Sequence, residues 1–235
     1  MTLRVMDLFS GIGGFSLGLK RAGGFRTVCY CEIDQYCQRV LEARMHDGSL
    51  DTAPICTDIR GLAGGPWRGK VDVICGGFPC QDISSAGRKA GIEGEKSGLW
   101  KEIARLVRQV RPSYVIVENV STLASRGLGV VLGDLAALGY DAEWSMLPAC
   151  SMGAPQPRRR VFIVAYPHRD GQPAFSFDAE VEGLPGDAEA VRNWRGSQPG
   201  TLRMADGVPG GMVRLHAIGN AVVPQVVEWI GRHLS

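Results

Sequence analysis

Cys80 is the residue whose type and position first suggest chemistry. The apolar run at residues 71–75 predicts a buried strand, and the glycine-containing segment 76–81, with Pro79 and Cys80, follows it directly. A parallel strand that ends in glycines delivers the next side chains to the carboxyl edge of its sheet, where ligands bind. Most free cysteines, however, are small buried hydrophobes. The segment alone leaves both interpretations of Cys80 open.

Other polar side chains lie at the ends of neighbouring predicted strands. The strand at residues 114–117 ends in Glu118, which places a carboxylate beside the cysteine strand. Arg158 and Arg160 precede a last apolar strand at residues 161–165, and arginines in that place face either a site or solvent. A cysteine, a carboxylate and arginines are thus predicted near one sheet edge.

The first three strands carry groups suited to a nucleoside. The strand at residues 3–9 leads into a glycine turn at 10–14 that starts a helix, but its spacing differs from the GxGxxG of dinucleotide binders. Pyrophosphate binding is therefore not expected, and a ligand without phosphates fits better. Glu32 ends the strand at 26–31 and could accept both ribose hydroxyls, although a surface acid is the alternative. Asp58 ends the third strand and could receive an adenine amine beside Ile59.

The order of elements predicts an α/β fold with a doubly wound, Rossmann-like and mostly parallel sheet. The chain has 235 residues, 45% of them hydrophobic, which suits one well-filled domain. Helices are expected at residues 99–110 and 128–138, and a strand at 140–147. Residues 166–215 have little apolar periodicity. We therefore expect a main domain of residues 1–165 plus 216–235, with a small variable insertion between them.

Composition narrows the cellular setting. The seven cysteines are odd in number and form no paired metal-binding pattern, which predicts a reduced, cytoplasmic protein without structural zinc. No apolar run reaches membrane-spanning length, and the chain does not open on a signal sequence, so no membrane association is expected. Net charge is only +2, yet basic residues crowd near Arg88 and Lys89, at 96–111 and at 158–160. They indicate a polyanion partner or a solvated surface.

Taken in order, the polar segments resemble the motifs of the DNA cytosine-5 methyltransferase family. Residues 7–14 are similar to its cofactor loop, 77–81 to its nucleophile loop and 118–120 to its catalytic acid motif. Gln156 with Arg158 and Arg160 matches its QxRxR motif, and 219–224 its last motif. The resemblance covers residues 3–165 and about 205–232, and residues 79–84 are similar to bacterial and phage-borne members in particular.

The resemblance implies a covalent mechanism on double-stranded DNA. In this family a cysteine thiolate, here Cys80, adds to carbon 6 of cytosine, so that carbon 5 can attack the methyl group of S-adenosyl-L-methionine. Glu118 would hydrogen-bond the pairing edge of the base, and Arg158 and Arg160 would hold the base and Glu118. The products would be 5-methylcytosine and S-adenosyl-L-homocysteine. The target base must first be flipped out of the duplex.

The resemblance also assigns binding residues. For the cofactor it implies Phe9, Gly11, Ile12, Gly13, Gly14, Glu32, Ile33, Asp58, Ile59, Pro79, Leu99, Asn220, Ala221 and Val222. For DNA we expect contacts from Gln81, Ser84, Arg88, Lys89, Arg195 and Arg203. We expect no bound metal, and we expect the protein to be a monomer.

Two departures from the family pattern stand out. Some members stack an aromatic residue on the adenine directly after the ribose acid, and this chain has Ile33 there. The family's substantial target-recognition domain is reduced here to residues 166–215, and a further motif that often precedes the domain is not found. An RNA-directed enzyme and a catalytically idle relative are the alternative functions. The intact residues Cys80, Glu118, Arg158 and Arg160 disfavour the idle relative.

Overall fold

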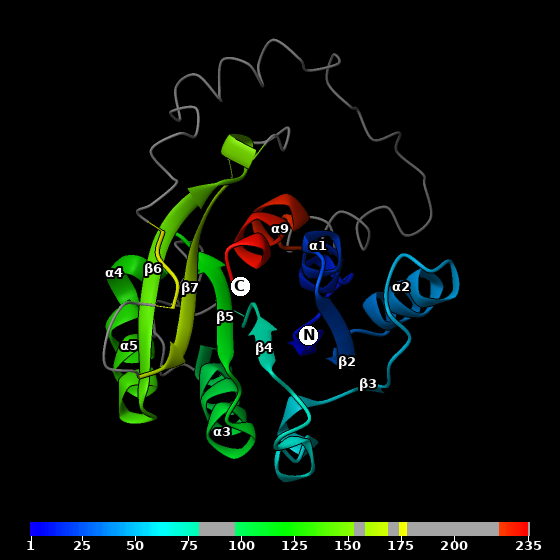
Figure 1. Ribbon diagram of the computed structural model, residues 1–235, viewed down its shortest axis with the longest axis horizontal. Helices are drawn as coiled ribbons and strands as arrows, with labels where there is room; N and C mark the ends of the chain where they lie inside the picture. Colours follow the sequence, from blue (N-terminus) through cyan, green and yellow to red (C-terminus); the bar gives the residue numbers. More distant parts are fainter. Residues whose placement is uncertain (80–96, 153–157, 169–173, 178–220, 235) are drawn as a thin grey trace.

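The computed structural model describes residues 1–79, 97–152, 158–168, 174–177 and 221–234. The described residues form a seven-stranded sheet in the order β3-β2-β1-β4-β5-β7-β6 (Figure 1). The strands are β1 Leu3–Leu8, β2 Phe25–Cys31, β3 Ile55–Cys56, β4 Val73–Gly76, β5 Tyr114–Val120, β6 Tyr140–Pro148 and β7 Arg159–Pro167. The first five pair in parallel, and β7 runs antiparallel to both of its neighbours. The predicted mostly parallel, doubly wound sheet is confirmed.

Helices cover both faces of this sheet. On one face, α1 (Gly14–Ala22) lies beside α9 (Pro224–Arg232), and both pack on Val5, Val73 and Ile116 (Figure 1). On the other face, α3 (Trp100–Val110) and α5 (Leu128–Ala137) pack on the intervening strand residues, among them Met6 and Ile74. Because both faces are buried, the central strands are apolar on both sides, which made them recognisable in the sequence.

The chain reverses its winding direction at β1. From β1 it moves outward to β2 and β3, and it then returns to place β4 on the other side of β1. In open α/β sheets the loops that leave such a switch point diverge and create a crevice at the carboxyl edge. The segments after β1 and β4 contain Phe9 and Pro79, so the topology brings the predicted cofactor and nucleophile loops to this crevice.

Several elements differ from the sequence-based expectation. Helix α2 (Gln35–His46) was not predicted, because it buries only Cys37 and Leu41; the Asp34 side chain caps its start. A short helix, α4 (Leu123–Arg126), precedes α5. Strand β5 continues through Val120, so Glu118 lies within the strand rather than after it.

Part of the predicted insertion packs against the main domain. Strand β7 extends to Pro167, and Phe175 and Phe177 are buried on the side of the sheet that α9 covers. The Phe177 ring stacks near Trp229 of α9, with ring centroids 6.3 Å apart. These described residues of the insertion are therefore part of the core of the main domain. This agrees with the small number of apolar residues in the insertion.

Candidate active site

Phe9 opens the crevice at the end of β1. It has a positive φ of 52°, a conformation that is costly for any residue with a side chain and that clusters at ligand sites. Phe9 lines two neighbouring cavities, together with Glu32 and Ile33. We name them the Asp58 cavity and the Glu118 cavity, each after an acidic residue that lines that cavity and not the other. Their shared wall means that one elongated ligand could reach from one into the other.

The Asp58 cavity has a volume of about 260 Å³. Its lining consists of Phe9, Cys31, Glu32, Ile33, Asp58, Ile59, Arg60 and Leu99. Five of the predicted cofactor residues besides Phe9 thus meet here. Ile33 is 64% exposed, so an apolar side chain stands open to the solvent at the rim. An exposed isoleucine beside two carboxylates suits a flat, polar-edged ligand such as adenosine.

Glu32 is fixed by backbone donors. Its Oε2 accepts a hydrogen bond of 2.7 Å from the Gly11 amide, and its Oε1 accepts one of 2.8 Å from the Asp34 amide. The first bond ties the end of β2 to the glycine turn after β1. Each carboxylate oxygen can accept a further bond, so Glu32 remains able to receive ribose hydroxyls.

Asp58 is paired with a residue that was not predicted. The Arg60 guanidinium contacts both carboxylate oxygens, with Nε 3.0 Å from Oδ1 and Nη2 2.9 Å from Oδ2. Hydrogen bonds from the Arg60 side chain and backbone lower the pKa of Asp58. The carboxylate is therefore charged and able to accept a hydrogen bond from an amine of a ligand. Only the closeness of Arg60 to Asp58 in sequence could have signalled this pair.

The Glu118 cavity has a volume of about 310 Å³ and is lined by three of the four predicted catalytic residues. Its lining includes Glu118, Arg158 and Arg160 together with Pro79, Ala221 and Val222. Strands β5 and β7 bring these side chains together because Glu118 pairs with Phe162 and Val120 with Arg160 in the antiparallel register. Segments distant in sequence thus converge on one pocket, as the motif order implied.

Glu118 is only 6% exposed and lies between two guanidinium groups. Arg160 Nε is 3.0 Å and Arg158 Nη2 is 3.9 Å from its Oε1. Burial raises the pKa of Glu118, and the charges of Arg160 and Arg158 oppose this in part. Such a carboxyl group can hold a proton closer to neutral pH than an exposed glutamate, which suits proton sharing with a ring nitrogen.

Two buried polar atoms beside this cavity have no hydrogen-bond partner among the described residues. They are Oε1 of Glu118, which is ion-paired with Arg160, and Nε of Arg158. Buried polar atoms are nearly always satisfied in native proteins. A ligand with hydrogen-bonding edges, such as a nucleobase, would supply what they lack. Arg158 Nη1 donates a 2.5 Å hydrogen bond to the Ala221 carbonyl, which ties the cavity wall to the segment before α9.

Gly77 and Asn119 hold the loop that leads to Cys80. A Cβ atom on Gly77 would lie 2.9 Å from Glu118 Oε2, so a side chain there would push the Glu118 carboxylate from its place. Asn119 is buried, and its Nδ2 donates a 3.1 Å hydrogen bond to the Phe78 carbonyl. Asn119 therefore positions the nucleophile loop. The sequence motif contained it, but its role was not predicted.

The remaining predicted residues divide into two groups. Ile12 and Gly13 lie in the turn and Gly14 begins α1, and none of the three lines either cavity. Cys80, Gln81, Ser84, Arg88, Lys89, Arg195, Arg203 and Asn220 lie outside the described residues. Phe15, Asp34 and Cys37 line the Glu118 cavity but were not predicted, because two of them belong to α2 or its cap.

The part of the chain that the structure describes contains no group of three or more His, Cys, Asp or Glu side chains arranged to hold a metal ion. Among its helices, none is both long and apolar enough to cross a membrane.

Known proteins share this architecture. An E. coli crystal structure described as a DNA modification methyltransferase encoded within a prophage superposes with a TM-score of 0.57 at 27% identity, over 71% of this chain and 47% of that one. The S. pombe Dnmt2 methyltransferase has a TM-score of 0.60 at 23% identity, over 76% and 53%, which shows the fold alone. The fold is that of S-adenosylmethionine-dependent methyltransferases.

The sequence comparisons identify the family. The family model for C-5 cytosine-specific DNA methylase matches residues 3–194. Type II methyltransferase M.DsaV of Dactylococcopsis salina is 34% identical over 187 residues, which are 77% of this chain and 50% of that protein. Type II methyltransferase M.HhaI of Haemophilus parahaemolyticus is 35% identical over 168 residues, or 70% and 49%. The chain belongs to the C-5 cytosine-specific DNA methylase family and spans about half the length of these relatives.

Proposed function

We propose that this chain methylates carbon 5 of cytosine in double-stranded DNA and uses S-adenosyl-L-methionine as its methyl donor. The carrying observation is the buried Glu118 between Arg158 and Arg160 in a cavity that shares a wall with the Asp58 cavity. One cavity suits a flipped base and the other an adenosine. Family membership supports the assignment of the two ligands.

The side chains of the Asp58 cavity fit the chemistry of this cofactor. The Asp58 cavity offers Glu32 for ribose hydroxyls, Asp58 for the adenine amine, and Ile33, Ile59 and Leu99 for the faces of the base. Pro79, Ala221 and Val222 would close the methionine end. When bound, S-adenosyl-L-methionine supplies an electrophilic methyl group.

The chain's own residues then act on the cytosine. The Cys80 thiolate forms a bond to carbon 6, and the ring electrons displaced by this addition make carbon 5 nucleophilic. Glu118 shares a proton with the ring nitrogen and accepts a hydrogen bond from the amine, which stabilises the charge that develops. Arg158 and Arg160 hold Glu118 and the base in place. After methyl transfer the carbon 5 proton leaves, and elimination breaks the bond to Cys80.

We further propose the division of labour along the chain. Residues 1–165 with 216–235 bind the cofactor and catalyse the reaction, and residues 166–215 contact the target sequence. The proposed DNA contacts are made by residues that are cationic or carry an amide or hydroxyl group, which suit phosphates and base edges: Gln81, Ser84, Arg88, Lys89, Arg195 and Arg203.

Transfer of a labelled methyl group from S-adenosyl-L-methionine tests the proposed function. The full chain is incubated with a mixed duplex DNA pool and, separately, with a tRNA pool. We expect label in cytosine of the duplex only, and none with the Cys80→Ser variant, whose alcohol is a far weaker nucleophile. Label in tRNA alone would show that the substrate is RNA and not DNA. Cofactor binding without methyl transfer to either pool would show that the protein binds the cofactor but is not an enzyme.

A further inference from the structure

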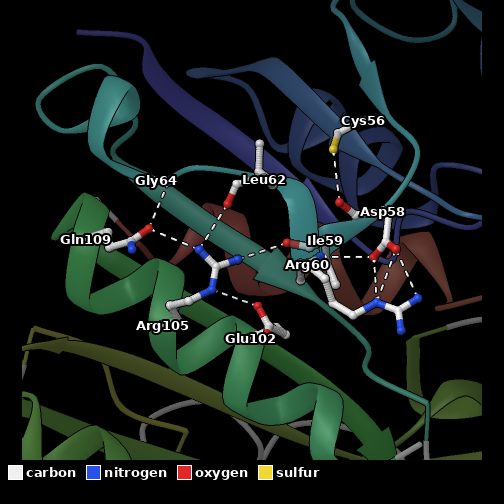
Figure 2. Close-up of polar contacts among 9 residues, drawn as sticks. All are labelled: Cys56, Asp58, Ile59, Arg60, Leu62, Gly64, Glu102, Arg105 and Gln109. Atoms are coloured by element: carbon white, nitrogen blue, oxygen red, sulfur yellow. Dashed lines mark hydrogen bonds and ion pairs between the residues drawn. The ribbon is translucent and has the colours of Figure 1, made fainter.

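Arg105 of α3 joins the helix to the segment that carries Asp58. Its Nη2 donates a 2.9 Å hydrogen bond to the Ile59 carbonyl, and its Nη1 donates one of 3.0 Å to the Leu62 carbonyl (Figure 2). The guanidinium is oriented from its own helix, since Nε lies 2.7 Å from Glu102 Oε2 and Nη1 lies 3.1 Å from Gln109 Oε1. These three α3 residues lie on one helix face at spacings of three and four.

A second bond fastens the same segment. The Gly64 amide donates a 2.8 Å hydrogen bond to Gln109 Oε1, the atom that Arg105 also contacts. A Cβ atom on Gly64 would lie 2.7 Å from the Gln109 side chain, so this approach is close. The segment from Ile59 to Gly64 is therefore held at three backbone groups by two side chains of α3 (Figure 2).

The sheet gives this segment little support of its own. Strand β3 has only two residues, and it pairs with β2 only at Tyr30 and Cys31. Asp58 lies two residues after the end of the strand, and its carbonyl accepts a 3.3 Å hydrogen bond from Cys56 Sγ. Ladder bonds at two residues fix the direction of a strand but not the course of the chain beyond it. The bonds from Arg105 are thus the main polar attachment after Ile59 among the described contacts.

We propose that Arg105 is a positioning residue of the cofactor site. Its side chain does not line the Asp58 cavity, yet it holds the carbonyls that place Asp58 and Ile59 on the wall of that cavity. The planar fork of a guanidinium serves two carbonyls at once, whereas a lysine ammonium is a point charge that cannot reproduce this geometry. The inference rests on the proposed function in one respect, namely that the Asp58 cavity takes the adenine.

Two homocysteine nucleosides separate positioning from general destabilisation. S-adenosylhomocysteine carries the exocyclic amine that would donate a hydrogen bond to Asp58. S-inosylhomocysteine carries a carbonyl in place of that amine. Wild-type protein is expected to prefer the adenosyl form. Arg105→Met should lower the affinity for it by about tenfold, as loss of one or two hydrogen bonds implies, and should reduce the preference between the two nucleosides. Arg105→Lys should fall between wild type and Arg105→Met.

Hydrogen exchange of the ligand-free protein gives a second readout. The Leu62 and Gly64 amides should exchange faster in Arg105→Met, while those of β1 and β4 should not. Arg108→Met, an exposed substitution on the same helix, is the matched control and should alter neither readout.

Two results would overturn the inference. One is unchanged exchange at residues 59–64, and the other is an equal loss of affinity for both nucleosides. Wild-type protein that binds neither nucleoside would refute the proposed cofactor itself, and Arg105 would then have no cofactor site to position. That failure is recognisable from the wild-type measurement alone.

Discussion

At the scale of single residues, the proposed mechanism depends on a carboxyl group whose protonation is set by its surroundings. Glu118 is buried, which raises its pKa, and it lies between Arg160 and Arg158, whose charges lower it. The pKa of Glu118 therefore reflects two opposing effects, the desolvation of the carboxylate and the charges of the two arginines. Gly77 and Asn119 also contact the loop and carboxylate here, so we propose that the position of the Glu118 carboxylate is set before a flipped base arrives.

Replacing Glu118 tests this role. Glu118→Gln keeps the size of the side chain but removes the proton that it shares, so the methyl-transfer step should slow by about 10² to 10⁴, as for other general acids. Affinity for S-adenosylhomocysteine should barely change. The measurement is a single-turnover rate on saturating duplex DNA, with Glu228→Gln on α9 as the control. A wild-type rate in Glu118→Gln would rule out the proposed role.

Asp7 makes stability depend on pH. This residue of β1 is fully buried; its Oδ2 accepts hydrogen bonds from the Ser16 amide and hydroxyl, and Oδ1 has no partner among the described residues. Burial raises the pKa of Asp7 from 3.8 to about 7, although the bonds from Ser16 oppose it. Since the folded state holds this proton more tightly, Asp7 stabilises the fold fully below about pH 4 and loses this effect as the pH rises toward 7.

The Asp7→Asn variant should lack this pH dependence. Between about pH 4 and pH 8, the difference in free energy of unfolding between wild type and variant should change by up to about 4 kcal/mol. Urea unfolding at several pH values measures it. Asp72 provides a contrast, because its hydrogen bonds with Arg4 lower its pKa, so its contribution is lost as the pH falls. A constant difference across the pH range for Asp7→Asn would contradict the assignment.

At the scale of elements, burial pattern decides what the sequence reveals. Strands β1, β4 and β5 are covered on both faces, so their continuous apolar runs were predicted. Helix α2 buries two side chains and gives almost no apolar period, which is why it was missed together with Cys37 in the cavity wall. Glu32 and Asp58 were predicted because they follow strands. The contacts of Arg105 and Asn119 depend on tertiary structure that no local pattern encodes.

The close contact between α1 and the segment before α9 can be tested by a substitution that adds one methyl group. A Cβ atom on Gly14 would lie 2.7 Å from the Val222 carbonyl oxygen and Cγ1, so Gly14→Ala forces backbone to move. Overpacking of this kind should cost about 1–3 kcal/mol of unfolding free energy. Because Val222 lines the Glu118 cavity, cofactor affinity should fall as well. Gly129→Ala in α5, where a Cβ atom meets nothing within 4 Å, should be neutral or stabilising.

At the scale of the whole molecule, the segment proposed to recognise the target, residues 166–215, is short. They contain few apolar residues in any period, and the described pair Phe175 and Phe177 packs on the main domain rather than forming a separate core. Rigid support for base-reading side chains is therefore limited. Most of the binding energy should come from phosphate contacts, which do not read sequence.

This predicts relaxed specificity. The target should comprise at most about four base pairs, given roughly one supported bidentate side chain per base pair, and DNA binding should weaken steeply with salt. Bisulfite sequencing of mixed-sequence DNA after methylation in vitro gives the target directly. Strict methylation within a site of about six or more base pairs would show that the segment reads far more than this estimate allows.

The most direct test of the account is covalent capture of the reaction at Cys80. DNA that carries 5-fluorocytosine should react with the enzyme and S-adenosyl-L-methionine, but fluorine cannot leave carbon 5 as a proton does, so elimination is blocked and the cysteine stays bound. The account predicts a denaturation-resistant complex of protein and DNA whose peptide map places the link on Cys80, and no complex with Cys80→Ser. Attachment to another cysteine, or active methylation without any trapped complex, would contradict it.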